Sequence, residues 1–131
     1  MIGRVRAAQL LVTAVLVTTL LPVGIARAAD GDPVRGEARF QECAACHKLE
    51  AGANEVGPSL HGLFMRKAGE LADFRYSPAM KRSGIVWTPE TLEKYIADPQ
   101  ATVPANRMPY AGMANASDRA DLIAYLSKAS K

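Results

Sequence analysis

The stretch FQECAACHKLE, residues 40–50, contains both cysteines of the 131-residue chain, Cys43 and Cys46, and one of its two histidines, His47. Two alanines separate the cysteines, and the histidine directly follows the second one. Three kinds of site use cysteines at such close spacing: a structural zinc site, a thioredoxin-like redox pair and a covalent haem attachment. The choice among them decides around what kind of centre the chain folds.

The rest of the chain favours haem. A structural zinc site needs four ligands, and the only histidine besides His47 is His61, in a different context. A thioredoxin-like pair belongs to a βαβ unit, and no such unit is visible. C-x-x-C-H is the pattern of covalent haem attachment. We therefore predict one haem c with its iron, attached through thioethers at Cys43 and Cys46, with His47 as an axial ligand.

The first 28 residues have the three parts of a secretory signal peptide. MIGRVR is short and basic, residues 7–25 carry no charge, and small residues precede a cleavage site after Ala28. An uncleaved membrane anchor is the alternative, because this uncharged run approaches the roughly 20 residues that span a bilayer. Pro22 and Gly24 break the run and favour cleavage. We predict a signal peptide at 1–28 and an exported periplasmic domain at 29–131.

The charge balance argues against a nucleic-acid partner. Three of the 16 Lys and Arg residues and none of the 13 Asp and Glu residues lie in the first 28 positions. The remaining part of the chain therefore carries 13 of each and is formally neutral. The basic pI belongs to the leader, and no basic patch with aromatic residues is visible.

The fold class predicted for residues 29–131 is all-α, with short helices and long loops. Capping residues followed by proline, or by apolar residues at helical spacing, mark the helices, and no strand shows convincing alternation. The first helix is expected to face inward through Val34, Ala38 and Phe40. The expected helices follow the caps Asp32, Ser77, Thr88 and Ser117, and the segments 48–76 and 101–115 are expected to be irregular.

A single histidine leaves the opposite face of the iron without a ligand. His61 and four methionines at positions 65, 80, 108 and 113 are the candidates. A ligand has to come from a segment that crosses to the far face. The loop before the last helix contains NRMPYAGM, in which Pro104 and Pro109 restrict the backbone around Met108.

Four segments together resemble a class I c-type cytochrome of the mitochondrial-like bacterial type. They are GDPVRGEARFQECAACH, GPSLHGLFMRKAG, GIVWTPETLEKYIADP and RMPYAGM followed by DRADLIAYL. The resemblance covers essentially all of residues 29–131, in order. It implies the class I cytochrome c fold, with short helices and long loops around one covalent haem.

The resemblance also implies roles for individual residues around the haem. Met108 matches the axial methionine, and Pro58 matches the proline whose carbonyl accepts the proximal imidazole N–H. Tyr95 matches a tyrosine that hydrogen-bonds near the methionine sulfur. A further group matches residues that hydrogen-bond a haem propionate: Arg66, Tyr76 and Trp87. Contact between the first and last helices is implied for Gly36, Phe40, Leu122 and Tyr125.

Four positions depart from the family pattern. Asn106 replaces a threonine and is expected to contact a propionate in its place. Met80 replaces an asparagine near the haem, and Tyr110 replaces a phenylalanine at the haem edge. Glu42 stands where a lysine is usual, which argues against a docking mode steered by lysines.

The function implied is that of a periplasmic monohaem electron carrier, monomeric and not an enzyme. It would pass single electrons between donor and acceptor proteins at an exposed haem edge. Expected partners are a cytochrome bc-type complex, a terminal oxidase or a periplasmic dehydrogenase. The alternatives are a membrane-tethered haem subunit of an oxidase or dehydrogenase complex and a haem peroxidase, which would need a vacant iron position.

Overall fold

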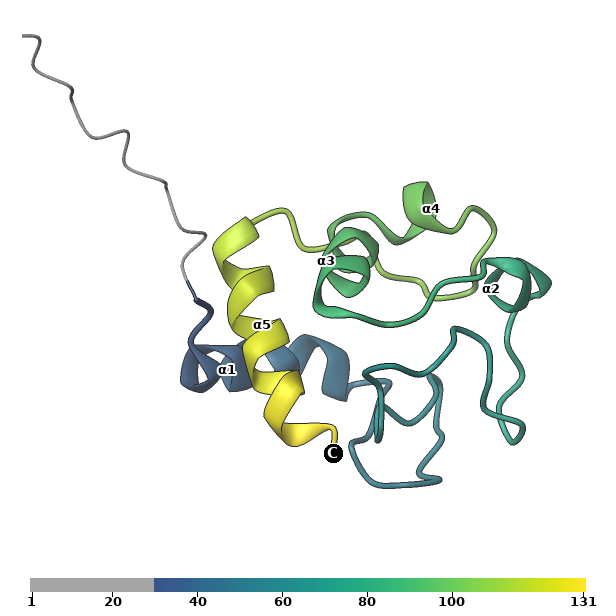
Figure 1. Cartoon of the computed structure of the whole chain (residues 1–131), viewed down its shortest axis with the longest axis horizontal. Helices are drawn as coiled ribbons and strands as arrows, with labels where there is room; N and C mark the ends of the chain where they lie inside the picture. The colour runs from purple at the N-terminus through teal and green to yellow at the C-terminus, as the bar shows by residue number, and fades with distance from the viewer. Residues whose placement is uncertain (1–29) are drawn as a thin grey trace, which may run out of the picture.

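The computed structural model describes residues 30–131, which form five helices joined by long irregular segments (Figure 1). The predicted signal peptide, residues 1–28, lies outside the described residues. Residues 30–131 form no β-strand, and one isolated antiparallel bridge joins Lys67 to Val86. No helix in this range is both long enough and apolar enough to cross a membrane. The all-α class predicted from the sequence is confirmed.

Helix α1 (Pro33–Ala44) begins where the sequence predicts. The side chain of Asp32 accepts hydrogen bonds from the backbone N–H groups of Val34 and Arg35. The proline in the first helical position has no N–H that would need a partner there. The predicted inward face is confirmed at Phe40 but wrong at Val34, which is 77% exposed, and at Ala38, which is also exposed. The helix is rotated about its axis relative to this prediction because Gly36 faces the last helix.

Helices α1 and α5 (Ala116–Ala129) cross at one end of the molecule (Figure 1). Gly36 is buried at the crossing, and a Cβ atom at this position would collide with the backbone of Asp121. Phe40, one turn later, packs its ring against Tyr125 with the ring centroids 5.4 Å apart. The missing side chain at position 36 therefore sets how closely the two backbones approach.

The carboxylate of Asp121 joins the start of α1 to α5. Its oxygens accept hydrogen bonds from the backbone N–H of Asp32 at 2.6 Å and from Arg35 Nε and Nη2 at 2.7 and 2.9 Å. The Arg35 hydrogen bond, followed by that from Asp32, lowers the pKa of Asp121 below its ordinary value. The first described residues are thus held on the last helix by a charged contact.

Helices α2 (Pro78–Arg82) and α3 (Pro89–Ala97) also begin with proline after a capping residue. Ser77 accepts a hydrogen bond from the backbone of α2, and Thr88 forms a reciprocal capping box with Thr91. Both helices are confirmed as predicted. Glu90 lies in the first turn of α3, where a negative charge suits the helix dipole.

Two predictions for the C-terminal part are corrected. Pro99–Thr102 forms a short helix, α4, because the Asp98 side chain caps it, whereas residues from 101 onward were expected to be irregular. Helix α5 is capped by Asn115 and not by Ser117, since the Asn115 side chain accepts hydrogen bonds from two backbone N–H groups of the first turn. Asparagine is among the preferred capping residues, and it comes first along the chain.

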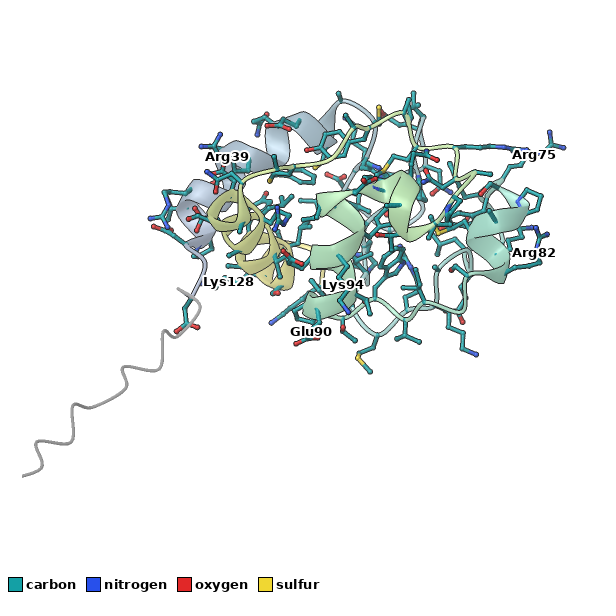
Figure 2. All side chains as sticks on the ribbon, turned by 90° about the horizontal axis from the view of Figure 1, so that it is seen from above. Arg39, Arg75, Arg82, Glu90, Lys94 and Lys128 are labelled. Atoms are coloured by element: carbon teal, nitrogen blue, oxygen red, sulfur yellow. The ribbon has the colours of Figure 1, made fainter. Side chains whose placement is uncertain are left out.

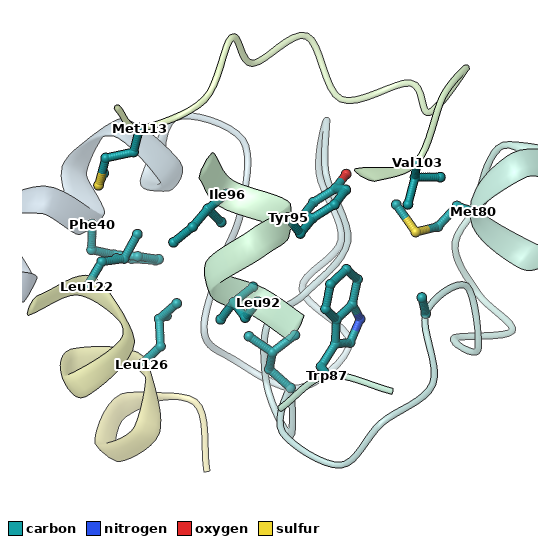
Figure 3. Close-up of a cluster of buried hydrophobic side chains, with 12 residues drawn as sticks. Phe40, Met80, Trp87, Leu92, Tyr95, Ile96, Val103, Met113, Leu122 and Leu126 are labelled. Carbon is teal, nitrogen blue, oxygen red and sulfur yellow. The ribbon is translucent and has the colours of Figure 1, made fainter. Parts of the chain in front are cut away.

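The hydrophobic core is small and gathers around α3 (Figure 3). The rings of Trp87 and Tyr95 pack with their centroids 5.1 Å apart. Leu122 and Leu126 reach this core from α5. The buried apolar residues are Phe40, Leu63, Ala68, Met80, Trp87, Leu92, Tyr95, Ile96, Val103, Met113, Leu122 and Leu126.

Among the described residues, two that are not glycine have left-handed backbone conformations. They are Met65, with φ of 67°, and Ala105, with φ of 64°. An L-residue pays roughly 1–2 kcal/mol for this conformation. Met65 directly precedes Arg66, and Ala105 directly precedes Asn106.

Candidate haem site

A cavity of about 330 Å³ lies between the end of α1, the loop that follows it, α3 and the segment 107–110. Its lining is predominantly apolar. The four residues predicted to hold the haem, Cys43, Cys46, His47 and Met108, all line this one cavity. The apolar lining residues include Val56, Leu60, Leu63, Phe74, Met80, Trp87, Leu92, Ile96, Leu122 and Leu126.

Cys43 and Cys46 are half-buried free thiols at the end of α1. The backbone N–H groups of Cys46 and His47 both donate to the Cys43 carbonyl, at 3.0 and 2.9 Å, and so hold the motif in a tight turn. Burial, and then the nearby Glu42 and Cys46, raise the pKa of Cys43 to about 11. The Cys43 thiol is therefore protonated at neutral pH.

The imidazole of His47 is fixed by the backbone beside it. Its Nδ1 lies 2.7 Å from the carbonyl oxygen of Pro58, the contact that the resemblance predicts. A carbonyl can only accept, so Nδ1 carries the proton and Nε2 keeps its lone pair. Burial lowers the pKa of His47, and the Pro58 contact opposes this shift in part. A Cβ atom at Gly57 would collide with the ring, so glycine leaves room for it.

Met108 lies in the irregular segment between α4 and α5 and is held from two directions. Its backbone N–H donates to Asn106 Oδ1 at 2.8 Å. The hydroxyl of Tyr95, on α3, lies 3.9 Å from the Met108 sulfur and donates to it. Burial raises the pKa of Tyr95 to about 12, so this hydroxyl remains a donor at neutral pH. The predicted proximity of Tyr95 and Met108 is present.

Arg66 provides the test of whether the cavity fits a haem. Its Nη1 and Nη2 donate to the carbonyls of His61 and Ser59, at 2.7 and 3.0 Å. Its Nε is buried and has no hydrogen-bond partner among the described residues, although Arg66 lines the cavity. An unsatisfied cationic donor in an apolar cavity calls for an anionic acceptor, and a haem carboxylate is one. Tyr76 and Trp87 line the same cavity.

The remaining candidates for the second axial ligand lie in different places. His61 and Met65 are exposed and do not line the cavity. Met113 is buried in the core, where its backbone N–H donates to the Ile96 carbonyl. Met80 lines the cavity, but from within α2.

Two contacts at the site were not predicted from the sequence. Asn106 is buried behind Met108 and is not part of the cavity lining, although a haem contact was expected for it. Tyr110 donates from its hydroxyl to Glu42 Oε2 at 3.0 Å. This bond joins the residue before the first cysteine to the segment that contains Met108. The sequence marks both residues only as departures from the family pattern.

Short helices around an apolar cavity, with a C-x-x-C-H motif at its edge, define a class I c-type cytochrome. The sequence model of the family described as cytochrome c matches residues 33–130, and the chain belongs to this family. Its cofactor is haem c, with iron. It is an electron-transport protein.

Individual relatives agree with this assignment. The chain is 52% identical to cytochrome c2 iso-2 of Magnetospirillum fulvum over 66% of its own length and 91% of the relative's. It is 48% identical to cytochrome c2 of Rhodoblastus acidophilus over 75% of its own length and 92% of the relative's. The solved structure of cytochrome cH from Methylobacterium extorquens is similar with a TM-score of 0.70 and 42% identity, covering 74% of this chain and 98% of that one.

Proposed function

We propose that the protein carries single electrons in the periplasm, with His47 and Met108 as the two axial ligands and Cys43 and Cys46 as the thioether attachments. The observation that carries this proposal is that all four side chains line the same apolar cavity. With both axial positions filled by the protein, no position would remain for a substrate. We therefore expect electron transfer without enzymatic turnover.

The bound haem supplies the redox chemistry, one electron gained or lost at iron. The chain's residues prepare the site for it. The Pro58 carbonyl holds the His47 ring so that Nε2 is the free nitrogen, and burial keeps the imidazole neutral. A neutral thioether such as that of Met108 favours the less charged ferrous state, and the apolar lining acts in the same direction.

Met108 is a better candidate for the second ligand than Met80. Met80 belongs to helix α2 and is 8% exposed within the hydrophobic core. Met108 lies in a loop and its sulfur already accepts the hydroxyl of Tyr95. A hydrogen bond to the sulfur fixes its orientation, as hydrogen bonds to metal ligands do at other metal sites.

The partners we expect are a cytochrome bc-type complex, a terminal oxidase or a periplasmic dehydrogenase, and we expect the carrier itself to be a monomer. Charged side chains are spread around the molecule, with Arg75 and Arg82 at one end and Arg39 and Lys128 near the other (Figure 2). At the cavity itself, Glu42 and Arg107 both belong to the lining. Such mixed charge predicts electron-transfer rates that depend only weakly on salt.

The ferric absorption spectrum of the purified holoprotein tests the proposal. A weak near-infrared band from sulfur-to-iron charge transfer is expected in the wild type and in Met80→Leu, and should be absent in Met108→Ala. A wild type without the band and with high-spin features would overturn the role of Met108 and favour a peroxidase. N-terminal sequencing and the intact mass of the exported protein would distinguish cleavage after Ala28 from a tethered form.

A further inference from the structure

The segment that leads from α4 to Met108 contains a polar side chain in an unusual position. Asn106 is only 8% exposed, although it lies in an irregular loop near the surface. The residue before it, Ala105, has a left-handed backbone conformation, so the chain turns sharply there. A buried amide is costly unless its donors and acceptor are satisfied, so its partners show what the residue does.

The amide of Asn106 is fully engaged with the backbone on either side of it. Its Nδ2 donates to the carbonyls of Pro99 and Val103 at 2.8 and 2.9 Å. Its Oδ1 accepts from the backbone N–H of Met108 at 2.8 Å. Both amide hydrogens are thus used, and neither is directed to the cavity, whose lining does not include Asn106.

These contacts tie Met108 to the end of α4 through a single side chain. Val103 and Pro99 are themselves fully buried or nearly so, so one end of the connection is anchored in the interior. Asn106 therefore binds the backbone N–H of Met108, while Tyr95, on α3, donates a hydrogen bond to the Met108 sulfur. Removal of the amide would leave the Met108 N–H without its partner, whereas the Pro99 and Val103 carbonyls would keep the backbone N–H groups of Val103 and Asn106 as donors.

We infer that Asn106 is a positioning residue that sets the backbone of Met108 and thereby holds its sulfur at the cavity. The inference rests on the proposed axial role of Met108. It assigns to Asn106 a task different from contact with a haem carboxylate, because its two donors have other acceptors. The measurable consequence is that Asn106 controls how easily another ligand replaces the methionine.

The test is imidazole binding to the ferric holoprotein, followed in the near-infrared band. Asn106→Ala should weaken the band and bind imidazole about tenfold more tightly, since lost buried hydrogen bonds cost on the order of one factor of ten. Asn115→Ala is the matched control. Asn115 likewise accepts from two backbone N–H groups, at 2.8 and 3.2 Å, but at the start of α5. It should lower the unfolding midpoint and leave band and imidazole affinity unchanged.

Asn106→Thr provides a second measurement if Asn106→Ala fails to fold. A hydroxyl can donate to one carbonyl and accept from the Met108 N–H, so imidazole should bind more tightly than to the wild type but less tightly than to Asn106→Ala. An affinity equal to that of the wild type in the Asn106 variants, or the same increase in Asn115→Ala, would overturn the inference. A wild type that lacks the band would instead overturn the axial role of Met108, before any variant is measured.

Discussion

His47 and Met108 line the same cavity, but the two residues are held by different means. Backbone groups fix His47: the carbonyl of Pro58, eleven positions away, binds its Nδ1, and Gly57 leaves room for its ring. Side chains fix Met108, through Asn106 and Tyr95. The histidine side is therefore set by local chain geometry, whereas the methionine side depends on side chains brought together by the fold.

The histidine side and the methionine side should therefore respond differently to substitutions. A backbone contact survives most side-chain substitutions, but it cannot move aside when bulk is added. A side-chain hydrogen bond is removed by one substitution, and the loop that it holds can then adjust. The histidine side should be rigid and intolerant of added atoms, while the methionine side should be adjustable and tolerant of them.

The largest effect on folding is expected from removing both attachment cysteines, because neither the histidine side nor the methionine side then has a haem to pack against. In Cys43→Ala, Cys46→Ala, the cavity of about 330 Å³ would be left among a small hydrophobic core. A large cavity is costly and a bound cofactor stabilises the folded state, so we expect a largely unfolded chain. Far-ultraviolet circular dichroism of the exported chain measures this.

The same variant also tests whether the histidine side folds without haem. Native helical content without haem would contradict the expectation. Selective protection of α1 and α5 from proteolysis, with cleavage in the segment around Met108, would show that the histidine side folds on its own. Wild-type holoprotein under the same conditions is the control.

A smaller effect is expected from one added methyl group on the histidine side. Gly57→Ala would place a Cβ against the His47 ring, and overpacking of this kind costs about 1–3 kcal/mol of unfolding free energy. The ring is held by Pro58 and cannot turn away without losing that bond. Urea unfolding of the holoprotein gives the cost.

Gly84→Ala is the matched control for Gly57→Ala. A Cβ at Gly84 meets no atom within 4 Å, and only its backbone conformation, with φ of +69°, opposes the substitution. We expect no change in the haem spectrum from Gly84→Ala and a changed spectrum from Gly57→Ala. Identical spectra in the two variants would show that the histidine side can adjust after all.

The Asp121 contact makes the α1–α5 crossing sensitive to acid. Arg35 lowers the pKa of Asp121 below its ordinary value of 3.8, so the ionised carboxylate stabilises the folded state at neutral pH. This contribution is present above the ordinary pKa and is lost as the pH falls through the folded-state pKa. Asp121→Asn removes it at every pH.

Urea midpoints of wild type and Asp121→Asn between neutral pH and about pH 3 measure this contribution, since the ordinary pKa of aspartate lies near 4. The difference between the two proteins should be largest at neutral pH and should shrink in acid. Two curves that stay parallel over the whole range would contradict a role for the charge. The near-infrared band should be unaffected at neutral pH, because the contact lies away from Met108.

The smallest effect is expected for the bond between Tyr110 and Glu42. Tyr110→Phe removes one exposed hydrogen bond at the methionine side, and we expect imidazole to bind the ferric protein about two- to tenfold more tightly. Glu42→Gln keeps an acceptor oxygen and should change the affinity less. Tyr125→Phe, whose ring packs against Phe40 at the helix crossing, is the control and should leave imidazole binding unaltered.

The sequence predicts the histidine side well because its determinants are close together in the chain. The cysteine pair, the histidine and the caps of α1, α2 and α3 are short patterns, each satisfied by neighbouring backbone. The family resemblance correctly brings Pro58 to His47 and Tyr95 to Met108. Patterns of this kind need no knowledge of which distant residues meet.

Other features of the fold and the site could not be predicted from the sequence, because they depend on contacts between residues that are not neighbours in a recognisable pattern. Glu42 and Tyr110 are 68 positions apart, and nothing in either neighbourhood marks them as a pair. The family pattern assigns Asn106 to the haem by its position, but the orientation of its side chain follows from its hydrogen bond to the Pro99 carbonyl of α4, a helix that the sequence does not predict. Periodicity alone predicts that Val34 faces inward, whereas the close approach of the α5 backbone to Gly36 decides which face of α1 is buried.

The left-handed conformations of Met65 and Ala105 have a consequence for the evolution of this chain in the laboratory. Asparagine tolerates this conformation far better than methionine or alanine and would recover about 1 kcal/mol at each position. It would do so without the extra freedom of the unfolded chain that glycine brings. A library selected for heat resistance should therefore enrich asparagine at positions 65 and 105, while Arg66 and Asn106 beside them stay unchanged.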